Sequence, residues 1–218
     1  MDNLLEHAVQ NLADRQRGIL DQEKYVRTAV LLPIIRDKEG DWAILFEKRA
    51  STLRNQAGEI CFPGGHVEPQ DQSEWETAKR ETIEELGVEA EMIKYVADLD
   101  ILVNAHDLLV YPYAAFLSID QGIVPDRNEV DEVFSVKLAK LISMEPITYD
   151  MQIRVEPEDN FPFHLIANGR NYKWKNGKRN THFYEVDGKV IWGITAQILK
   201  HFLELLKQDP ELCQKLGN

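Results

Sequence analysis

The chain has 218 residues, of which 44% are hydrophobic and 28% are charged, and its formal net charge is −12. This length and composition are typical of a soluble globular protein and exclude a fibrous or disordered chain. The negative charge repels a phosphate backbone, so we expect no nucleic-acid partner, and a phosphorylated ligand would require a cation between itself and the protein.

The N-terminal region is acidic and amphipathic, which predicts a helix over about residues 3–22. It lacks the basic start and apolar block of a signal peptide, and no stretch reaches the roughly 20 apolar residues of a membrane span. We therefore expect a cytoplasmic protein with no membrane partner and a single domain over 1–218. Cys61 and Cys213 lie far apart, without metal-like spacing, so reduced buried thiols are expected.

A strand hairpin is predicted after the N-terminal helix. The largely apolar run over 25–35 ends at a turn over 37–40, and a second apolar run follows over 42–49. After a polar loop, a short strand at 60–62 leads into the paired glycines Gly64-Gly65. These glycines mark a tight turn in front of the next element.

A helix is predicted after the glycine turn. Ser73 is a suitable N-cap, with Glu76 three residues later in the capping-box pattern. The helix should run from about Glu74 to Leu86, because Gly87 is a typical C-terminal stop.

The second half of the chain predicts more strands and two helices. The expected elements are strands at 88–103 and 108–119, a strand end and short helix at 133–143, hairpins between 147 and 190, and an amphipathic helix at 191–208. Within the hairpin region, Asn176-Gly177 is a turn signal. Mixed strands and helices without a repeat predict the α+β class.

Three glutamates gather on one side of the helix at 74–86. At 3.6 residues per turn Glu81 and Glu85 lie one above the other, and Glu84 lies beside them. Like charges at this spacing destabilise a helix by roughly 0.2–0.5 kcal/mol per pair, unless a cation occupies that side. Carboxylates are typical ligands of Mg²⁺ and Mn²⁺, and Mg²⁺ often shares its remaining positions with substrate phosphates.

Taken alone, the acidic pattern has two interpretations. It also fits a solvated helix surface, on which Arg80 pairs with Glu84 at i,i+4. The surrounding glycines favour the metal site, because Gly64-Gly65 precede the helix and Gly87 ends it. A glycine can bring a backbone carbonyl close to a bound ion where a side chain would obstruct it.

The stretch 65–88 resembles the Nudix box, G-x5-E-x7-R-E-U-x-E-E-x-G-U, in which U is apolar. Residues 80–88, RETIEELGV, match its second half. Thr82 departs from the usual apolar residue, and the first half is longer by one residue counted from Gly65. Asp71, or else Glu68, stands near the place of the missing glutamate.

The segment before the box, LFEKRASTLRNQAGEICFPGG, resembles the motif LLTxRSx3Rx3Gx3FPGG of the coenzyme A pyrophosphatase branch of this family. The matching positions are Leu45, Arg49, Arg54, Gly58 and Phe62-Pro63-Gly64-Gly65. The departures are Phe46, Glu47 and Ala50. That branch is also similar in the longer box and in a late WG-x-T-A segment, here 192–196.

The resemblance extends over most of 27–205 but not to the N-terminal helix or 156–180. It implies a Nudix fold, with a mixed β-sheet between helices. It also implies metal-dependent hydrolysis of the pyrophosphate bond of coenzyme A or its thioesters, giving 3′,5′-ADP and a 4′-phosphopantetheine product. Pyrophosphate hydrolysis suits such a site, because metal ions neutralise phosphoryl charge and activate water.

The same resemblance assigns roles to the box residues. Glu81 and Glu85 would be ligands of Mg²⁺ or Mn²⁺, with the Gly65 carbonyl completing the site. Glu84 would be a further ligand or the acceptor of the water proton. Arg80 would support the catalytic glutamates through salt bridges.

Substrate-binding candidates lie just upstream of the box, at Arg49, Arg54, Gly64 and Gly65. Arginine forks match phosphate oxygens, which favours a function for Arg54; for Arg49 a plain surface charge stays open.

Other candidates are weaker. Glu129 and Glu132 could supply a base, but a solvated surface is the preferred interpretation. Four aromatic residues could stack adenine, but packing within hairpins is preferred: Phe161, Phe163, Tyr172 and Trp174.

Alternative functions stay open at this level. One is a Nudix hydrolase of another nucleotide derivative, such as a dinucleotide, ADP-ribose or a nucleotide sugar. Another is a non-catalytic nucleotide-binding module, against which the three retained glutamates argue. A third, a purely structural domain, leaves the glycine and arginine spacing unexplained. The resemblance also suggests a homodimer.

Overall fold

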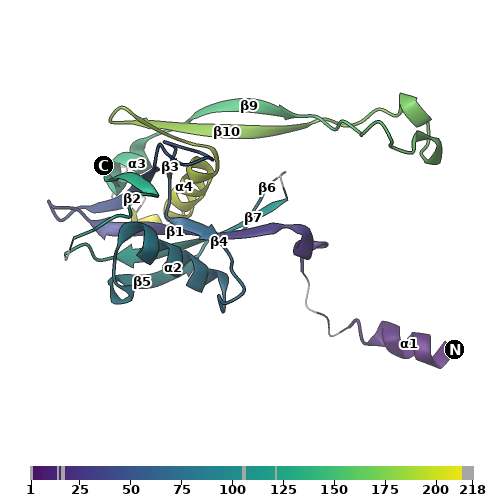
Figure 1. Cartoon of the computed structure of the whole chain (residues 1–218), viewed down its shortest axis with the longest axis horizontal. Coiled ribbons are helices and arrows are strands. Elements are labelled where there is room, and N and C mark those ends of the chain that lie inside the picture. Colours follow the sequence, from purple (N-terminus) through teal and green to yellow (C-terminus); the bar gives the residue numbers. More distant parts are fainter. Residues whose placement is uncertain (1, 14, 16–17, 105–106, 121, 213–218) are drawn as a thin grey trace.

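A mixed eight-stranded β-sheet forms the centre of the molecule (Figure 1). The computed structural model describes all residues except 1, 14, 16–17, 105–106, 121 and 213–218, so Cys213 lies outside the described part. The strands are β1 (Val26–Arg36), β2 (Trp42–Arg49), β3 (Ile60–Cys61), β4 (Gly64–His66), β5 (Ile93–Asp98), β6 (Leu102–Asn104), β7 (Leu108–Leu117) and β8 (Val130–Lys137). Their order is β3-β2-β1-β7-β5, with β4 on β1, β6 on β7 and β8 on β2.

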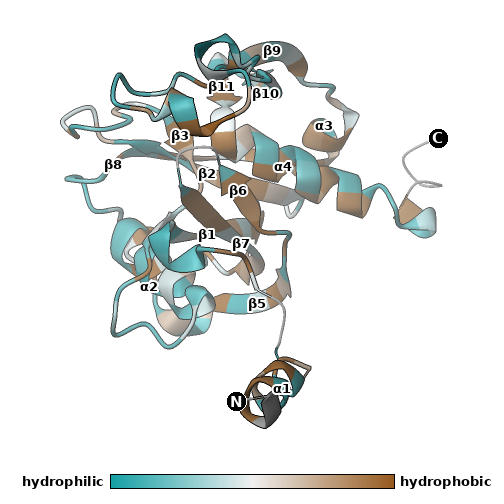
Figure 2. Cartoon of the chain, turned by 90° about the vertical axis from the view of Figure 1, so that its right-hand side faces the viewer, coloured by the Kyte–Doolittle hydropathy of each residue, from teal (hydrophilic) through white to brown (hydrophobic). Residues whose placement is uncertain are grey.

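Strand β1 is central because both of its faces are apolar. Leu31 and Ile35 face the helix α2 (Glu74–Leu86), whereas Leu32 and Ile34 belong to the opposite cluster, with α3 (Leu138–Ser143) and α4 (Gly193–Leu206). β1 pairs with β7 in parallel and with β2 antiparallel. Figure 2 shows the apolar strands between α2 and α4. The predicted α+β fold, a mixed sheet between helices, is confirmed.

A second, three-stranded sheet consists of β9 (Ile147–Ile153), β10 (Gly177–Val186) and β11 (Lys189–Trp192). Its inner side packs on the α4 cluster through Tyr184, Val186 and Ile191. The β9–β10 ribbon then leaves the domain and carries short 3-10 turns at its tip, at Phe163–Leu165 and Gly169–Asn171 (Figure 1).

The predicted turn at Asn176-Gly177 is wrong. Gly177 begins β10, and the tight turn lies at Asp187-Gly188, where both residues have positive φ angles of 52° and 76°. A two-residue hairpin turn needs such angles. The aromatic packing of the 154–176 loop, in which Trp174 contacts Phe161 and Tyr172, overrides the local Asn-Gly signal.

The predicted N-terminal helix is too long. α1 covers Asp2–Gln10, and the next helical element among the residues that the structure describes is a 3-10 turn at Gln22–Lys24. α1 lies apart from the sheets (Figure 1), and its apolar side chains Leu4, Leu5 and Val9 are exposed. An isolated helix without tertiary packing is marginal, which accounts for the short length of α1.

The predicted strand over 88–103 is interrupted. A 3-10 turn at Ala90–Met92 precedes β5, and β6 is a separate short strand beyond Leu99, both paired with β7. No described helix is both long and apolar enough to cross a membrane.

Candidate active site

The capping residues set the two ends of the acidic helix α2. Ser73 is the N-cap, and its Oγ accepts a hydrogen bond from the Glu76 amide at 3.3 Å. Gly87 ends the helix with φ of 62°, and its amide donates to the Ile83 carbonyl. The departure at Thr82 is tolerated because its buried hydroxyl donates to the Ala78 carbonyl at 2.7 Å.

Glycine is required at positions 64 and 65 because β1 and the Glu81 side chain approach the backbone there closely. β4 runs antiparallel to β1, with Gly64 opposite Val30 and Gly65 opposite Ala29. A Cβ on Gly64 would overlap the Ala29 carbonyl oxygen, and one on Gly65 would overlap the Glu81 carboxylate. The turn and the acidic side of α2 are therefore in direct contact, as a shared ligand site requires.

A buried pair of carboxylates lies beneath this contact. Glu85 is 3% exposed, and its Oε2 accepts a hydrogen bond from the Gly64 amide at 2.9 Å. Glu47, on β2, is fully buried, and the Cys61 thiol donates to its Oε1 at 3.2 Å. Burial, together with the charge of Glu47, raises the pKa of Glu85 to about 9, and burial, together with the charges of Glu129 and Glu81, raises the pKa of Glu47 to about 7.

Glu81 adds a third carboxylate to this group. Burial raises its pKa, and the neighbouring charges of Glu84 and Glu129 act in the same direction, against Arg80. Oε2 of Glu47 is buried and lacks a hydrogen-bond partner among the described residues. Crowded carboxylates with an unused oxygen form a donor set that suits a divalent cation such as Mg²⁺ or Mn²⁺.

Arg80 fixes the arrangement of the acids. Its guanidinium bonds both oxygens of Asp71 at 3.1 Å, Glu81 at 2.9 Å and Glu84 at 3.2 Å. It also donates to the His66 carbonyl, in β4. Arg80 therefore links the glycine turn to the helix as a positioning residue. Asp71, rather than Glu68, is the residue that this network uses in the first half of the box.

Glu129 and Glu132, for which a solvated surface was the preferred interpretation, lie in different surroundings. Glu129 lies close enough to raise the pKa values of Glu47, Glu81 and Glu85. Its backbone carbonyl accepts from the Ala50 amide, while the Asp126 amide bonds the Glu85 carbonyl, so the 126–129 loop lies against both β2 and α2. Glu132 instead forms an ion pair with Lys189 at 2.7 Å.

The two candidate arginines differ in position. Arg49 ends β2, its charge acts on Glu47, and its buried Nε has no partner among the described residues. Its backbone bonds Glu59 and Gly58 fold the upstream motif against β2. Arg54 is exposed in that loop. Phosphate binding by either stays a prediction, and the Gly64 amide is already engaged by Glu85.

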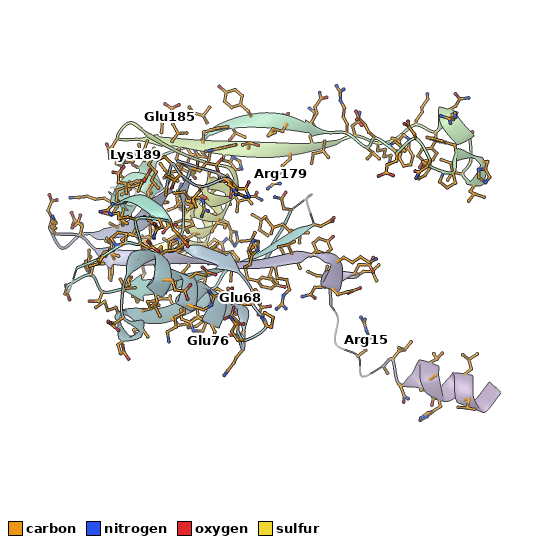
Figure 3. All side chains as sticks on the ribbon, viewed as in Figure 1. Arg15, Glu68, Glu76, Arg179, Glu185 and Lys189 are labelled. Carbon is orange, nitrogen blue, oxygen red and sulfur yellow. The ribbon has the colours of Figure 1, made fainter. Side chains whose placement is uncertain are left out.

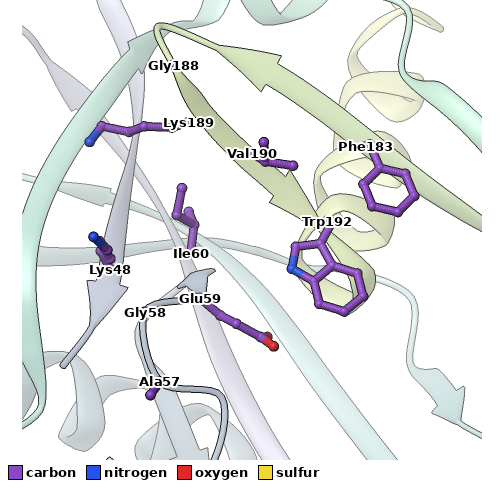
Figure 4. Close-up of a pocket in the computed structure, with 10 residues that line it drawn as sticks. All are labelled: Lys48, Ala57, Gly58, Glu59, Ile60, Phe183, Gly188, Lys189, Val190 and Trp192. Carbon is purple, nitrogen blue, oxygen red and sulfur yellow. The ribbon is translucent and has the colours of Figure 1, made fainter. Parts of the chain in front are cut away.

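A pocket of about 540 Å³ opens on the other side of β2 and β3 (Figure 4). The motif loop lines it through Gly58 and Glu59, and the second sheet contributes Phe183 and Trp192, whose rings stack at 6.0 Å. Because side chains alternate along a strand, Glu47 faces the acids while Lys48 lines this pocket.

Sequence reasoning missed Glu47 as a site residue. The available signal was its place as a departure from the motif, a charged residue in the apolar run at 42–49. The aromatic candidates, in contrast, pack on one another at the tip of the ribbon, with ring centroids 4.9–5.7 Å apart. Figure 1 places that tip far from α2.

Comparisons with known proteins place this site in a family. The model of the NUDIX domain matches residues 25–153. Peroxisomal coenzyme A diphosphatase NUDT7 of Mus musculus is 32% identical over 214 residues, covering 96% of this chain and 83% of that protein. Nudix hydrolase 3 of Caenorhabditis elegans is 28% identical over 201 residues, covering 88% and 78%.

A plant relative is longer. Nudix hydrolase 22, chloroplastic, of Arabidopsis thaliana is 28% identical over 193 residues, covering 84% of this chain and 56% of that protein. The chain thus spans about half the length of this relative. The matched family region includes the glycine turn, α2 and the 126–129 loop, and it covers more than half of the chain. From this match and the site it contains, we conclude that the chain belongs to the Nudix family.

Proposed function

We propose that this protein hydrolyses the pyrophosphate bond of coenzyme A or acyl-CoA, giving 3′,5′-ADP and a 4′-phosphopantetheine product. The observation that carries the proposal is the approach of the Glu81 and Glu85 carboxylates to the Gly64-Gly65 turn, with the buried Glu47 near enough for its charge to act on Glu85. The upstream motif around Gly58 and the similarity to a coenzyme A diphosphatase favour this substrate among nucleoside diphosphate derivatives.

The carboxylates would hold Mg²⁺ or Mn²⁺. Glu81 and Glu85 are the proposed ligands, with the Gly65 carbonyl, and the unused oxygen of Glu47 is available beside them. A bound divalent cation supplies neutralisation of phosphoryl charge and a lowered pKa for bound water. An acidic protein needs this neutralisation to bind a diphosphate at all.

Side chains of the protein would position the metal ligands and accept the proton of the attacking water. Arg80 keeps Glu81 and Glu84 in place through its ion pairs. Glu84 is exposed at the site and is the proposed acceptor of the water proton, and Glu129 is the alternative because it approaches the same carboxylates from the loop. Arg49, beside Glu47, is the nearer candidate for a phosphate contact.

The overall reaction is an addition of water across one anhydride linkage. A phosphorus–oxygen bond to the bridging oxygen breaks, the water oxygen joins the attacked phosphorus, and the bridging oxygen leaves with the other phosphate. The water proton passes to the carboxylate base. No oxidant and no reactant other than water is needed.

The test is a chromatographic product assay with CoA, acetyl-CoA, NADH, ADP-ribose and diadenosine polyphosphates, with Mg²⁺ or Mn²⁺. The Glu84→Gln and Glu85→Gln variants are assayed beside the wild type, with Glu76→Gln as the matched control. Glu76 lies on the same helix but is exposed near its N-terminus (Figure 3).

Metal-dependent release of 3′,5′-ADP from CoA, lost in the two site variants and kept in the control, is the expected result. Turnover of another substrate alone would retain the hydrolase and reject the CoA assignment. Absence of turnover with every substrate would reject catalysis and favour a nucleotide-binding module.

A further inference from the structure

The strand β9 is an unpaired edge of the second sheet. The order of that sheet is β11-β10-β9, so β9 has β10 on one side and no neighbouring strand on the other among the described residues. All seven residues of β9 are exposed. An exposed strand edge presents free amides and carbonyls to any strand that can pair with it.

The side chains of β9 are apolar on the outer side. Ile147, Tyr149, Met151 and Ile153 alternate with polar residues, and they are 46%, 64%, 55% and 38% exposed. Ile147 pairs with Phe183, whose neighbour Tyr184 points into the core. At the base of the ribbon the ring of Tyr149 contacts that of Phe183 at 5.9 Å. Because side chains alternate, the apolar side of β9 faces away from the α4 cluster. A one-sided antiparallel sheet normally carries polar residues there.

Nothing in β9 blocks pairing with another strand. Protected edges typically carry proline, lysine or a bulge, but the β9–β10 register is continuous from Ile147 to Ile153, and β9 contains neither proline nor lysine. The only charges in or next to it are Asp150 and Arg154, four positions apart. Such a strand is suited to a partner that supplies both apolar neighbours and the opposite charges.

We propose that two copies of this chain pair through β9, antiparallel, about a two-fold axis at Gln152. Asp150 then lies opposite Arg154 of the partner subunit, and symmetry forms this ion pair twice. Tyr149 lies opposite Val155 of the partner subunit, and Met151 lies opposite Ile153 of the partner subunit. Opposite residues in an antiparallel pair are about 4.5–5.5 Å apart at Cβ, close enough for these contacts.

The charges select this register. With the axis at Asp150, that residue would face its own copy, and with the axis at Ile153 it would face Glu156 of the partner subunit. With the axis at Met151, Asp150 would face Gln152 of the partner subunit, without an opposite charge. Only the axis at Gln152, among these four neighbouring positions, pairs opposite charges. A two-fold interface requires such self-complementarity.

The charge of the ribbon tip supports a second copy as the partner. From Asn160 to Tyr184 the chain has no acidic residue, and it carries five basic ones: Arg170, Lys173, Lys175, Lys178 and Arg179. The whole chain has a net charge of −12. In the antiparallel pair each tip extends past the start of the partner's β9, toward the acidic domain of the other copy. Arg179, bonded to Asn104 and Gln197, ties the ribbon to its own domain.

The test is a charge exchange followed by light scattering and sedimentation. Wild type is expected to form a dimer that dissociates on dilution. Asp150→Arg and Arg154→Asp each place like charges opposite one another and should give monomers. The double variant restores opposite charges across the axis and should restore the dimer. Asp150 also pairs with Lys178 at 3.3 Å. This pair is lost both in Asp150→Arg and in the double variant, so its loss cannot explain a difference between those two proteins.

Glu185→Arg is the control, because Glu185 lies on β10, near the base of the ribbon, and not on the free edge (Figure 3). A second measurement is oxidation of Gln152→Cys, which should give a covalent dimer, whereas Thr148→Cys and wild type should not. A monomeric wild type, a single variant that stays dimeric, or a double variant that stays monomeric would each overturn the proposal. The outcome is independent of the substrate, because it is read without activity.

Discussion

The acidic site at α2 and the free edge of β9 differ in which of their groups lack a partner. At α2 the polar groups are crowded: Glu85 and Glu47 are buried together, and one oxygen of Glu47 has no partner among the described residues. At β9 the groups are exposed, with apolar side chains and a free backbone edge. The first region has more carboxylates than arginines to neutralise them, and the second has apolar side chains exposed to solvent.

The difference indicates what each region would bind. Excess negative charge within a few side chains is neutralised by a small cation. An extended strand with alternating apolar and charged residues is complemented by another strand. Substitutions at α2 that change charge without changing shape should therefore have a large effect on hydrolysis. At β9, dimer formation should depend on whether opposite charges face each other across the two-fold axis.

The largest effect is expected for Glu85→Gln. The amide keeps an acceptor for the Gly64 amide but removes the buried negative charge. We expect kcat to fall by at least about 10²-fold. Removal of a single group that stabilises transition-state charge typically has an effect of this size. At neutral pH the metal-free variant should melt at a higher temperature than wild type, because folding no longer has to protonate a buried carboxyl that is ionised in the unfolded chain. Steady-state assays and thermal melts check both, and a lower melting temperature would contradict the crowded-carboxylate account.

Gly65→Ala should have the next largest effect. Its Cβ would overlap the Glu81 carboxylate and displace it, and a displacement of about 1 Å in a catalytic group can cost about 10²-fold in rate. The assay is kcat together with the Mg²⁺ concentration for half-maximal activity. Gly18→Ala is the control, because no atom lies within 4 Å of its added Cβ. Equal behaviour of the two variants would argue against the contact of turn and helix.

Arg80→Lys should be weaker but specific. Lysine keeps the charge and loses the fork that bonds both oxygens of Asp71. Groups that orient metal ligands typically change metal affinity by about 10–100-fold. We expect a higher Mg²⁺ requirement with a partial loss of kcat at saturating metal. An unchanged Mg²⁺ requirement would assign Arg80 to stability alone.

The smallest effect concerns the stability of the metal-free protein against pH. The folded-state pKa values of Glu85 and Glu47 lie above the ordinary 4.5, at about 9 and about 7. The folded protein then holds protons that the unfolded chain releases, so the free energy of unfolding should fall as pH rises from about 4.5 to about 9. Denaturant titrations at several pH values check this, and Glu85→Gln should flatten the slope. A stability that increases over this range would contradict the raised pKa values.

Local spacing was sufficient to predict the acidic helix. Ser73, Glu76 and Gly87 set the ends of α2, because caps depend on residues within one turn. The stripe of Glu81 and Glu85 depends only on helical periodicity. The β1–β2 hairpin and the C-terminal helix were predicted for the same reason, since their apolar patterns are long and regular.

Local patterns failed where packing decided the result. The N-terminal helix ends at Gln10 because no neighbouring element covers its apolar side. The Asn176-Gly177 signal gave no turn, because the aromatic tip sets the path of the loop. Propensity is a weak preference that tertiary contacts readily override.

The amino-acid sequence by itself determined the family and the helix with its stripe of glutamates, and it predicted a divalent cation beside them. Only the tertiary structure decided that Glu47 lies near Glu85, that Asp71 is the partner of Arg80, and that the apolar side of β9 faces away from the α4 cluster. The physical reason is the sequence separation between the residues that interact. Caps and periodicity are set by residues a few positions apart, whereas strand register and sheet packing bring together residues that no local pattern relates.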